Sequence, residues 1–387
     1  MLEYIWLLLP LGLLIGWLAA KRDNVKKQKM LRYLNLRYFI EESQEVDESL
    51  LTLPPDFDAD NLRFSLMLGD LFRKRGEIDK AINLHEYLIK EAPTKALTEK
   101  VYLSLAEDYL AAGMLDRAES TLRQLLESAE YRDLALLKLT KIYKQQREWL
   151  QSIAMLEQME SLTPLLKAEM AHLYCELAEE ALAEKSATGL ERVMLWLDKA
   201  YKADKNCVRA TLIRAYGLYQ YEQYALALET LLEIERQEIK LIPLIVPIVY
   251  ELYHLQSREE DFLTWLEAVI AKNHHIMLKV WKTHYLILHQ SFEAGINYLQ
   301  SSLKRDRNLL GLTILNQLQK YCQESESARL IDQTFQEMLD RYAQFQCDSC
   351  GYTTKTLQWS CPSCFEWNRS MPVEDIVALK VKHHGSA

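Results

Sequence analysis

The chain has 387 residues and a formal net charge of −9, with 49% hydrophobic and 26% charged residues. This balance excludes a disordered chain, and the acidic charge argues against a general nucleic-acid binder, whose footprint would be basic. A chain of this length exceeds one ordinary hydrophobic core, so we expect several folding units or an array of repeats. Only 11 glycines and 9 prolines occur, and long stretches are rich in Leu, Ala, Glu, Lys and Gln, which favours helix.

Residues 1–20 are predicted to form a transmembrane anchor. Residues 4–20 carry no charge, and as a helix they would rise roughly 26 Å, near the lower limit for spanning a bilayer core. Trp6 and Trp17 lie toward the two ends, where indole rings prefer the membrane interface. The alternative is a buried core helix, although such a helix has no need of the basic residues that follow.

Those basic residues decide the expected topology. Five of them follow the apolar run, whereas a secretory signal would carry its positive charge first: Lys21, Arg22, Lys26, Lys27 and Lys29. The positive-inside rule then places the bulk of the chain on the cytoplasmic side of a single-pass anchor. Residues 21–61 are interpreted as this basic collar with a degenerate first repeat, ending in the loop TLPPDFDAD.

Residues 62–345 are predicted to form a solenoid of helical hairpins. In four places two small residues lie 12 positions apart, and the position three after the first one is bulky. The small pairs are Gly69/Ala81, Ala106/Ala118, Thr140/Ser152 and Ala215/Ala227, and the bulky residues are Phe72, Tyr109, Tyr143 and Leu218. Gly76 and Gly113 stand seven positions after the first small residue, where the turn is expected.

The spacing has a physical reason. Two antiparallel helices joined by a tight turn need small side chains where their backbones approach, and large apolar ones where they meet the next hairpin. This spacing resembles the tetratricopeptide repeat. One further repeat fits before residue 215, with residues 190–206 as its second helix, and residues 236–345 would hold roughly three degenerate units at a period of ~34 residues. His85 falls in a second-helix core position, so we interpret it as a packed histidine rather than a catalytic one.

Residues 346–372 contain the strongest local motif. Cys347 and Cys350 form one Cys-x-x-Cys knuckle, and Cys361 and Cys364 form another ten residues later. Two such turns can direct four thiolates at one ion, which suits zinc or iron in a tetrahedral site. Four thiolates leave no open position, so the predicted site is structural and the metal would supply much of the stability of so small a module.

The residues around the knuckles support this interpretation. Gly351 allows the backbone a positive φ after the first knuckle, and four aromatic side chains could form a small core around the ion: Tyr352, Trp359, Phe365 and Trp367. Free or disulfide-bonded cysteines are the alternative reading. The other cysteines (Cys175, Cys207 and Cys322) are scattered, which suits a reducing compartment. Residues 373–387 are interpreted as a C-terminal tail.

The pattern C-x-x-C-G-Y…C-P-x-C resembles a rubredoxin knuckle pair. Two features depart from it: the gap between the knuckles is shorter, and Phe365 replaces the second glycine. Rubredoxins hold iron for electron transfer, so the resemblance implies iron, while zinc stays possible.

The chain as a whole resembles the lipopolysaccharide assembly protein B family of Gram-negative bacteria. The likeness rests on the opening MLE, the basic collar, LGDLFRKRGEIDKAI, YLAAGMLDRAE, AHLYCELA and TLQWSCPSC, in that order. It implies an all-α tetratricopeptide-repeat solenoid with an N-terminal transmembrane helix and a small rubredoxin-like four-cysteine metal ribbon packed against the repeats.

The same resemblance implies a membrane-tethered cytoplasmic adaptor at the inner membrane. Such an adaptor would bring the deacetylase of lipid A synthesis to a membrane-bound AAA protease and so limit lipopolysaccharide output. Its expected partners are the protease, the deacetylase and other inner-membrane lipopolysaccharide-assembly proteins, with homo-oligomers possible and nucleic acid not expected.

Two other functions are compatible with parts of the sequence. The first is a rubredoxin-like redox or electron-transfer protein carried on a repeat scaffold, which would need iron that cycles. The second is a zinc-ribbon nucleic-acid module, which the acidic balance disfavours. An enzyme is not expected, because the phosphate-binding, dinucleotide-binding, serine-hydrolase and H-E-x-x-H motifs are missing.

Overall fold

The structure is a computed structural model that describes residues 59–91, 94–184, 189–320, 333–334, 337 and 343–373. The predicted anchor, nearly all of the collar segment and the C-terminal tail lie outside these residues. Among the helices within the described ranges, none has the length and apolar character needed to cross a bilayer. The chain divides into two compact units, Met1–Glu148 and Trp149–Ala387.

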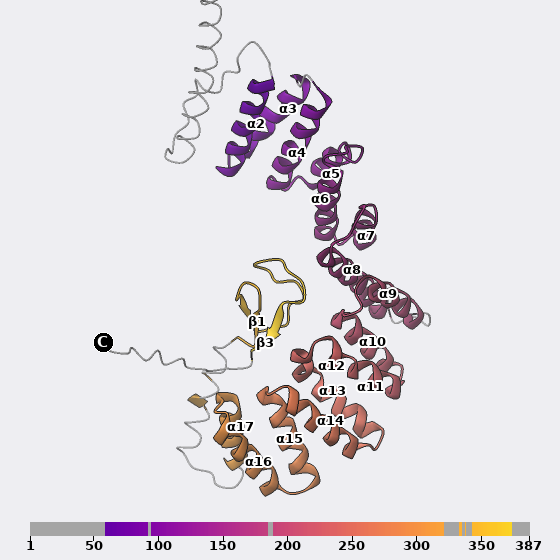
Figure 1. Cartoon of the computed structure of the whole chain (residues 1–387), viewed down its shortest axis with the longest axis vertical. Helices are drawn as coiled ribbons and strands as arrows, with labels where there is room; N and C mark the ends of the chain where they lie inside the picture. Colours follow the sequence, from indigo (N-terminus) through magenta and orange to yellow (C-terminus); the bar gives the residue numbers. More distant parts are fainter. Residues whose placement is uncertain are drawn as a thin grey trace, which may run out of the picture. The chain divides into compact units, whose positions relative to one another are not determined.

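The described part of the first unit, from residue 59 onward, consists of helices that pack as antiparallel pairs. They are α2 (Ala59–Lys74), α3 (Ile78–Glu91), α4 (Lys95–Ala111), α5 (Leu115–Arg123) and α6 (Arg132–Gln145). Helix α2 packs on α3 and α4 on α5, and each hairpin also contacts the next helix along the chain (Figure 1). The predicted small residues Ala81, Ala106 and Ala118 are fully buried, as close helix packing requires.

The described part of the second unit has the same architecture of paired helices, followed in sequence by a small ribbon. Its first helices are α7 (Trp149–Glu157), α8 (Pro164–Ala183), α9 (Gly189–Ala203), α10 (Val208–Gln220), α11 (Tyr224–Leu232) and α12 (Ile234–Gln237). A 3-10 turn, η2 (Ile239–Leu241), leads to α13 (Ile242–Leu255), α14 (Glu259–Lys272), α15 (Ile276–His289), α16 (Phe292–Arg305) and α17 (Leu309–Lys320). The hairpins predicted around Gly69/Ala81, Ala106/Ala118 and Ala215/Ala227 are therefore confirmed, as is the second helix expected near residues 190–206.

The turns repeat one geometry with and without glycine. Five positions, each two residues after a helix ends and two before the next begins, have a positive φ: Gly76, Gly113, Arg147, Glu222 and Ser257. In each turn the next residue donates its backbone N–H to the carbonyl five positions earlier, at 2.8–2.9 Å. This bond satisfies a carbonyl that the helix end would leave unpaired. Glycine occupies only two of the five positions, so residues with a side chain adopt the same turn in the other three.

Two later hairpins show why the repeat frame fades in the sequence. At the positions that hold a small pair elsewhere, α13 and α14 carry Tyr250 and Phe262, whose rings lie 5.0 Å apart in an edge-to-face contact. In α15 and α16 the small pair is Thr283 and Gly295, still 12 residues apart, and Ser291 caps the second helix in place of a positive-φ turn. The 12-residue spacing between the two contact positions persists, but the residue types at these positions change.

His85 is a buried structural histidine, as predicted. Its ring is fully buried, and its Nδ1 contacts the Asp108 carboxylate, which is also fully buried. Arg73 donates to the other oxygen of Asp108 at 2.7 Å and to Glu107 at 2.9 Å. This network ties α2, α3 and α4 together and satisfies a charge that burial would otherwise make costly.

The ribbon is a three-stranded antiparallel sheet with strand order β2-β1-β3. Strand β1 (Phe345–Cys347) lies in the middle, between β2 (Thr353–Thr354) and β3 (Ser370–Pro372). Cys347 pairs with Ser370, so the first metal-ligand candidate lies within the sheet itself.

Candidate metal centre and its docking site

Two knuckles of matching backbone geometry form the candidate metal centre. After the first, Gly351 has a φ of +77° and donates to the Cys347 carbonyl at 2.9 Å. After the second, Phe365 has a φ of +60° and donates to the Cys361 carbonyl at 2.9 Å. The positive φ predicted for Gly351 is confirmed, and Phe365 adopts the same conformation despite its side chain.

The four sulfur atoms lie where one ion could be held. All four Sγ atoms are within 4.8 Å of one another. The Cys347–Cys364 sulfurs are 3.7 Å apart and the Cys350–Cys361 sulfurs 3.6 Å apart. A regular tetrahedron with metal–sulfur bonds of about 2.3 Å has edges of about 3.8 Å, whereas a disulfide needs about 2.05 Å. The spacing fits a four-thiolate metal site, with each knuckle contributing to both close pairs.

The backbone favours thiolates at this site. The N–H of Tyr352 is the main cause that lowers the pKa of Cys350 to about 6, because it donates to the sulfur. The N–H of Glu366 acts in the same direction on Cys364, but burial and the three neighbouring cysteine sulfurs outweigh it and raise the pKa of that thiol to about 12. Metal ions bind the deprotonated sulfur, so these bonds assist metal capture.

The predicted aromatic core around the ion is wrong for two of its four members. Phe365 is 74% exposed and Tyr352 is 42% exposed, so neither ring belongs to a buried core. Trp359 and Trp367 are partly buried, but their partner is a residue of the solenoid rather than the other two rings.

That partner is His172 of α8, which anchors the ribbon to the repeats. The His172 ring stacks on Trp367 with centroids 4.4 Å apart and an interplanar angle of 17°, and the Trp359 ring lies 6.0 Å away. Its Nε2 lies 2.9 Å from Asn368 Oδ1, so the histidine donates to this amide oxygen if Nε2 carries the proton. Burial is the main cause that lowers the pKa of His172 to about 3, so the ring is neutral here. We call His172, Trp359 and Trp367 the ribbon clamp.

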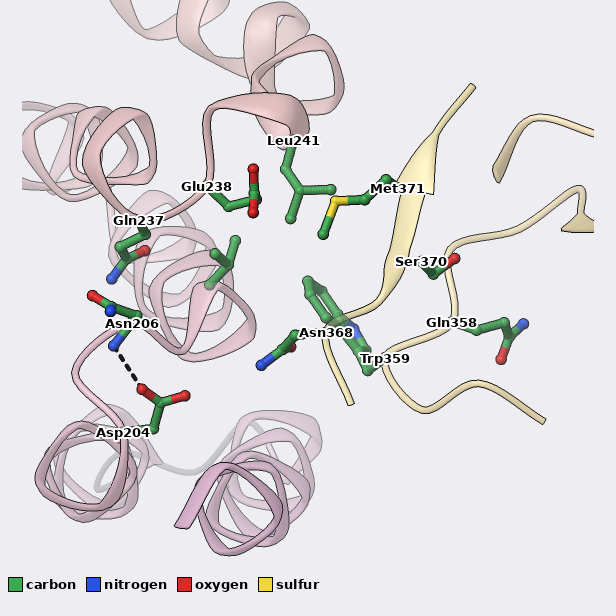
Figure 2. A pocket seen from close by; sticks show the side chains of 11 residues that line it. Asp204, Asn206, Gln237, Glu238, Leu241, Gln358, Trp359, Asn368, Ser370 and Met371 are labelled. Carbon is green, nitrogen blue, oxygen red and sulfur yellow. Dashed lines mark hydrogen bonds between the residues drawn. The ribbon is translucent and has the colours of Figure 1, made fainter. Parts of the chain in front are cut away.

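Further contacts extend the docking surface beyond the ribbon clamp. Met371 of β3 joins the buried core that includes Val208 and Leu241, and Trp359 packs on the same core. Lys240 of η2 lies 3.3 Å from Asp348, which follows the first knuckle cysteine. Between these contacts remains a pocket of about 170 Å³, lined by six residues of the helical part and five of the ribbon (Figure 2).

Sequence reasoning missed the ribbon clamp. His172 lies in the phrase AHLYCELA and is separated from Trp367 by 195 residues, so no local pattern connects them. The scattered cysteines also have a relationship that the sequence hides. Cys175 and Cys207 are both buried with sulfurs 3.9 Å apart, and both are free thiols.

Comparisons with known families and proteins agree with this geometry. Residues 345–369 match the family model described as "Rubredoxin metal binding domain". Lipopolysaccharide assembly protein B of Escherichia coli K12 is 27% identical over 398 residues, which cover 98% of this chain and 100% of that protein. The protein of the same name from Haemophilus influenzae is 27% identical over 405 residues, covering 97% of this chain and 99% of that protein.

Solved structures with partial likeness are repeat proteins. A tetratricopeptide repeat protein from Parabacteroides merdae has 12% identity and a TM-score of 0.33, covering 71% of this chain and 98% of its own. The C-terminal part of a repeat protein from Cytophaga hutchinsonii has 10% identity and a TM-score of 0.35, covering 69% and 98%. The solenoid assignment rests on the helix pairs themselves, because these scores are low.

Proposed function

We propose that this chain, which resembles lipopolysaccharide assembly protein B over 98% of its length, is a membrane-tethered cytoplasmic adaptor in lipopolysaccharide assembly. The observation that carries the proposal is this near full-length likeness, which includes the repeats and the metal ribbon together. The adaptor would limit lipopolysaccharide synthesis by promoting proteolysis of the lipid A pathway deacetylase by a membrane-bound AAA protease.

The architecture supports a scaffold rather than an enzyme. Stacked helical hairpins offer a long surface for other proteins. An anchor in residues 4–20 would confine the search for partners to the inner membrane and raise their effective concentration. The protease, the deacetylase and other inner-membrane lipopolysaccharide-assembly proteins are the proposed partners.

The tether can be tested in the bacterium that encodes this chain. A variant lacking residues 1–20 should keep its helical content but allow the deacetylase to accumulate, because the adaptor no longer meets a membrane-bound protease. The half-life of the deacetylase after translation is stopped gives the readout, and proximity labelling in native membranes identifies the partners. Normal restraint of the deacetylase by the untethered variant would refute the tether.

For the metal, we propose one ion held by Cys347, Cys350, Cys361 and Cys364. Iron is favoured by the rubredoxin-like knuckles, and zinc would fill the same four-thiolate site. Bound metal would fix the two knuckles relative to each other, and its own chemistry would matter only if it were redox-active iron.

The metal's identity decides between structural and electron-transfer roles. Elemental analysis of the purified full chain identifies the bound metal and gives the number of ions per chain. A visible Fe(III)–thiolate absorption that bleaches with a mild reductant would favour the electron-transfer alternative, whereas zinc would exclude it.

A further inference from the structure

We propose that the pocket between the ribbon and the helices is a recognition site for a lysine or arginine side chain of a partner polypeptide. The pocket is built from both parts: Asp204, Asn206 and Glu238 lie on the helical side, and Trp359 reaches in from the ribbon (Figure 2). This inference does not depend on the adaptor role proposed above, because it concerns the chemistry of the pocket alone.

The charge of the lining favours a cation. Both charged residues that line the pocket, Asp204 and Glu238, are acidic. Each accepts one backbone N–H, from Asn206 at 2.9 Å and from Lys240 at 3.2 Å respectively. Two neighbouring cations have other partners, since Lys240 pairs with Asp348 and Arg209 with Glu176 and Glu179.

The neutral polar groups of the lining are largely engaged already. Gln237 accepts from Thr211 at 2.9 Å and donates to the Lys205 carbonyl at 3.3 Å. Asn368 Oδ1 bonds His172, and Gln358 donates to Thr356 at 3.0 Å. The remaining capacity to bind a ligand lies in the two carboxylates, the indole, the Asn206 amide and the buried Ser370 hydroxyl, which has no partner among the described residues.

The indole and the size of the pocket further limit which ligand can bind there. A tryptophan face attracts ammonium and guanidinium groups, and its apolar edge suits the methylene stem of a long basic side chain. The volume of about 170 Å³ is below the roughly 300–1,000 Å³ of pockets for drug-sized ligands. One lysine or arginine side chain matches this size and places its charge beside the carboxylates.

The test measures binding of single side chains to the purified full chain. The probes are the N-acetyl methylamides of lysine, arginine and norleucine, titrated by saturation-transfer NMR. We expect the two basic probes to bind about tenfold more tightly than norleucine, because only they make charge-assisted contacts. Equal binding of norleucine would overturn the proposal, as would tighter binding of free putrescine than of the lysine probe.

Matched variants locate the site. Asp204→Asn combined with Glu238→Gln should weaken the lysine probe about tenfold, whereas Glu229→Gln, an exposed carboxylate on α11 outside the pocket, should leave it unchanged. Asn206→Lys should also abolish binding by supplying an internal ammonium. Unchanged affinity in both pocket variants, with normal circular dichroism, would overturn the assignment.

Discussion

Phe365 holds a backbone conformation that suits its counterpart Gly351 far better. Its φ is +60° and its side chain is 74% exposed, so little burial compensates the strained backbone. A left-handed conformation costs a residue with a side chain roughly 1–2 kcal/mol. The second knuckle is therefore the strained half of the metal site, and the four sulfur positions are kept in spite of it.

Single substitutions at these two positions should change the stability of the ribbon in opposite directions. Phe365→Gly should stabilise the ribbon by about 1 kcal/mol, since relief of strain exceeds the added chain entropy. Gly351→Ala should destabilise it by a similar amount, because an added Cβ meets only ordinary contacts and the strain alone remains. Competition with a chelator for the metal of the full chain measures both, and a weaker Phe365→Gly ribbon would contradict the prediction.

His172 should make the docked ribbon sensitive to acid. Its pKa is lowered to about 3 by burial, whereas an unfolded histidine titrates near 6.5. The unfolded state thus binds more protons between these values, and stability is lost as pH falls from about 6.5 toward 3, by up to about 1.4 kcal/mol per pH unit.

The measurement compares pH profiles of unfolding for the wild type and His172→Asn. The variant should be less stable at neutral pH but should lose less stability on acidification. Metal release at low pH affects both proteins, so the difference between the profiles isolates the histidine. Parallel profiles would show that the His172 ring does not titrate with unfolding.

At the scale of helices, the repeat hairpin is held by spacing more than by residue type. The α13–α14 hairpin keeps the positive-φ turn at Ser257 and the same backbone bond, but fills the small-residue positions with Tyr250 and Phe262. The two rings in edge-to-face contact fill the space between the helices, whereas a pair of alanines would let the two backbones approach closely. This hairpin is therefore packed through aromatic side chains.

Phe262→Ala introduces the alanine that other hairpins carry at this position. The substitution should nevertheless destabilise the second unit. Phe262 is fully buried, so its removal leaves a cavity and should cost about 3–5 kcal/mol. Denaturant unfolding measures the change, with the exposed Leu226→Ala as the control. If Phe262→Ala left the free energy of unfolding unchanged, the two helices would have to move together and fill the cavity.

The hairpins and the cysteine knuckles could be predicted from the sequence, whereas the aromatic pair and the ribbon clamp could not. The small pairs and two turn glycines were enough to predict the α2–α3, α4–α5 and α10–α11 hairpins, because close approach of two helix backbones demands small residues. The Tyr250/Phe262 pair could not be recognised, since large rings at those positions are a different solution to the same packing. The knuckle cysteines were predictable from local spacing, whereas the ribbon clamp depends on contacts across 195 residues.

At the scale of the second unit, metal binding and ribbon docking should be linked. Trp359 and Trp367 flank the second knuckle, and Ser360 and Trp367 form a backbone bridge across it. An ion bound by Cys361 and Cys364 would therefore hold both indole rings in place against His172. Loss of the ion should loosen the ribbon clamp before it affects the helices.

Limited proteolysis of the full chain tests this link. Lys355 and Arg369 are exposed trypsin sites within the ribbon, and cleavage there should accelerate about tenfold or more after removal of the metal or in Cys350→Ser, as expected for a module that depends on its metal. His172→Ala, which keeps all four cysteines, should accelerate cleavage less. Resistance of the metal-free ribbon to trypsin would refute the link.

Docking of the ribbon also changes how this unit should unfold. An ordinary repeat array is governed by nearest neighbours, so it frays from its ends one hairpin at a time. Here residues 359–371 touch α8 and η2, which lie more than a hundred positions earlier. The ribbon thus stabilises helices that precede it by more than a hundred residues, and a truncation before residue 345 should destabilise the helix around residue 172 as well as the new terminus.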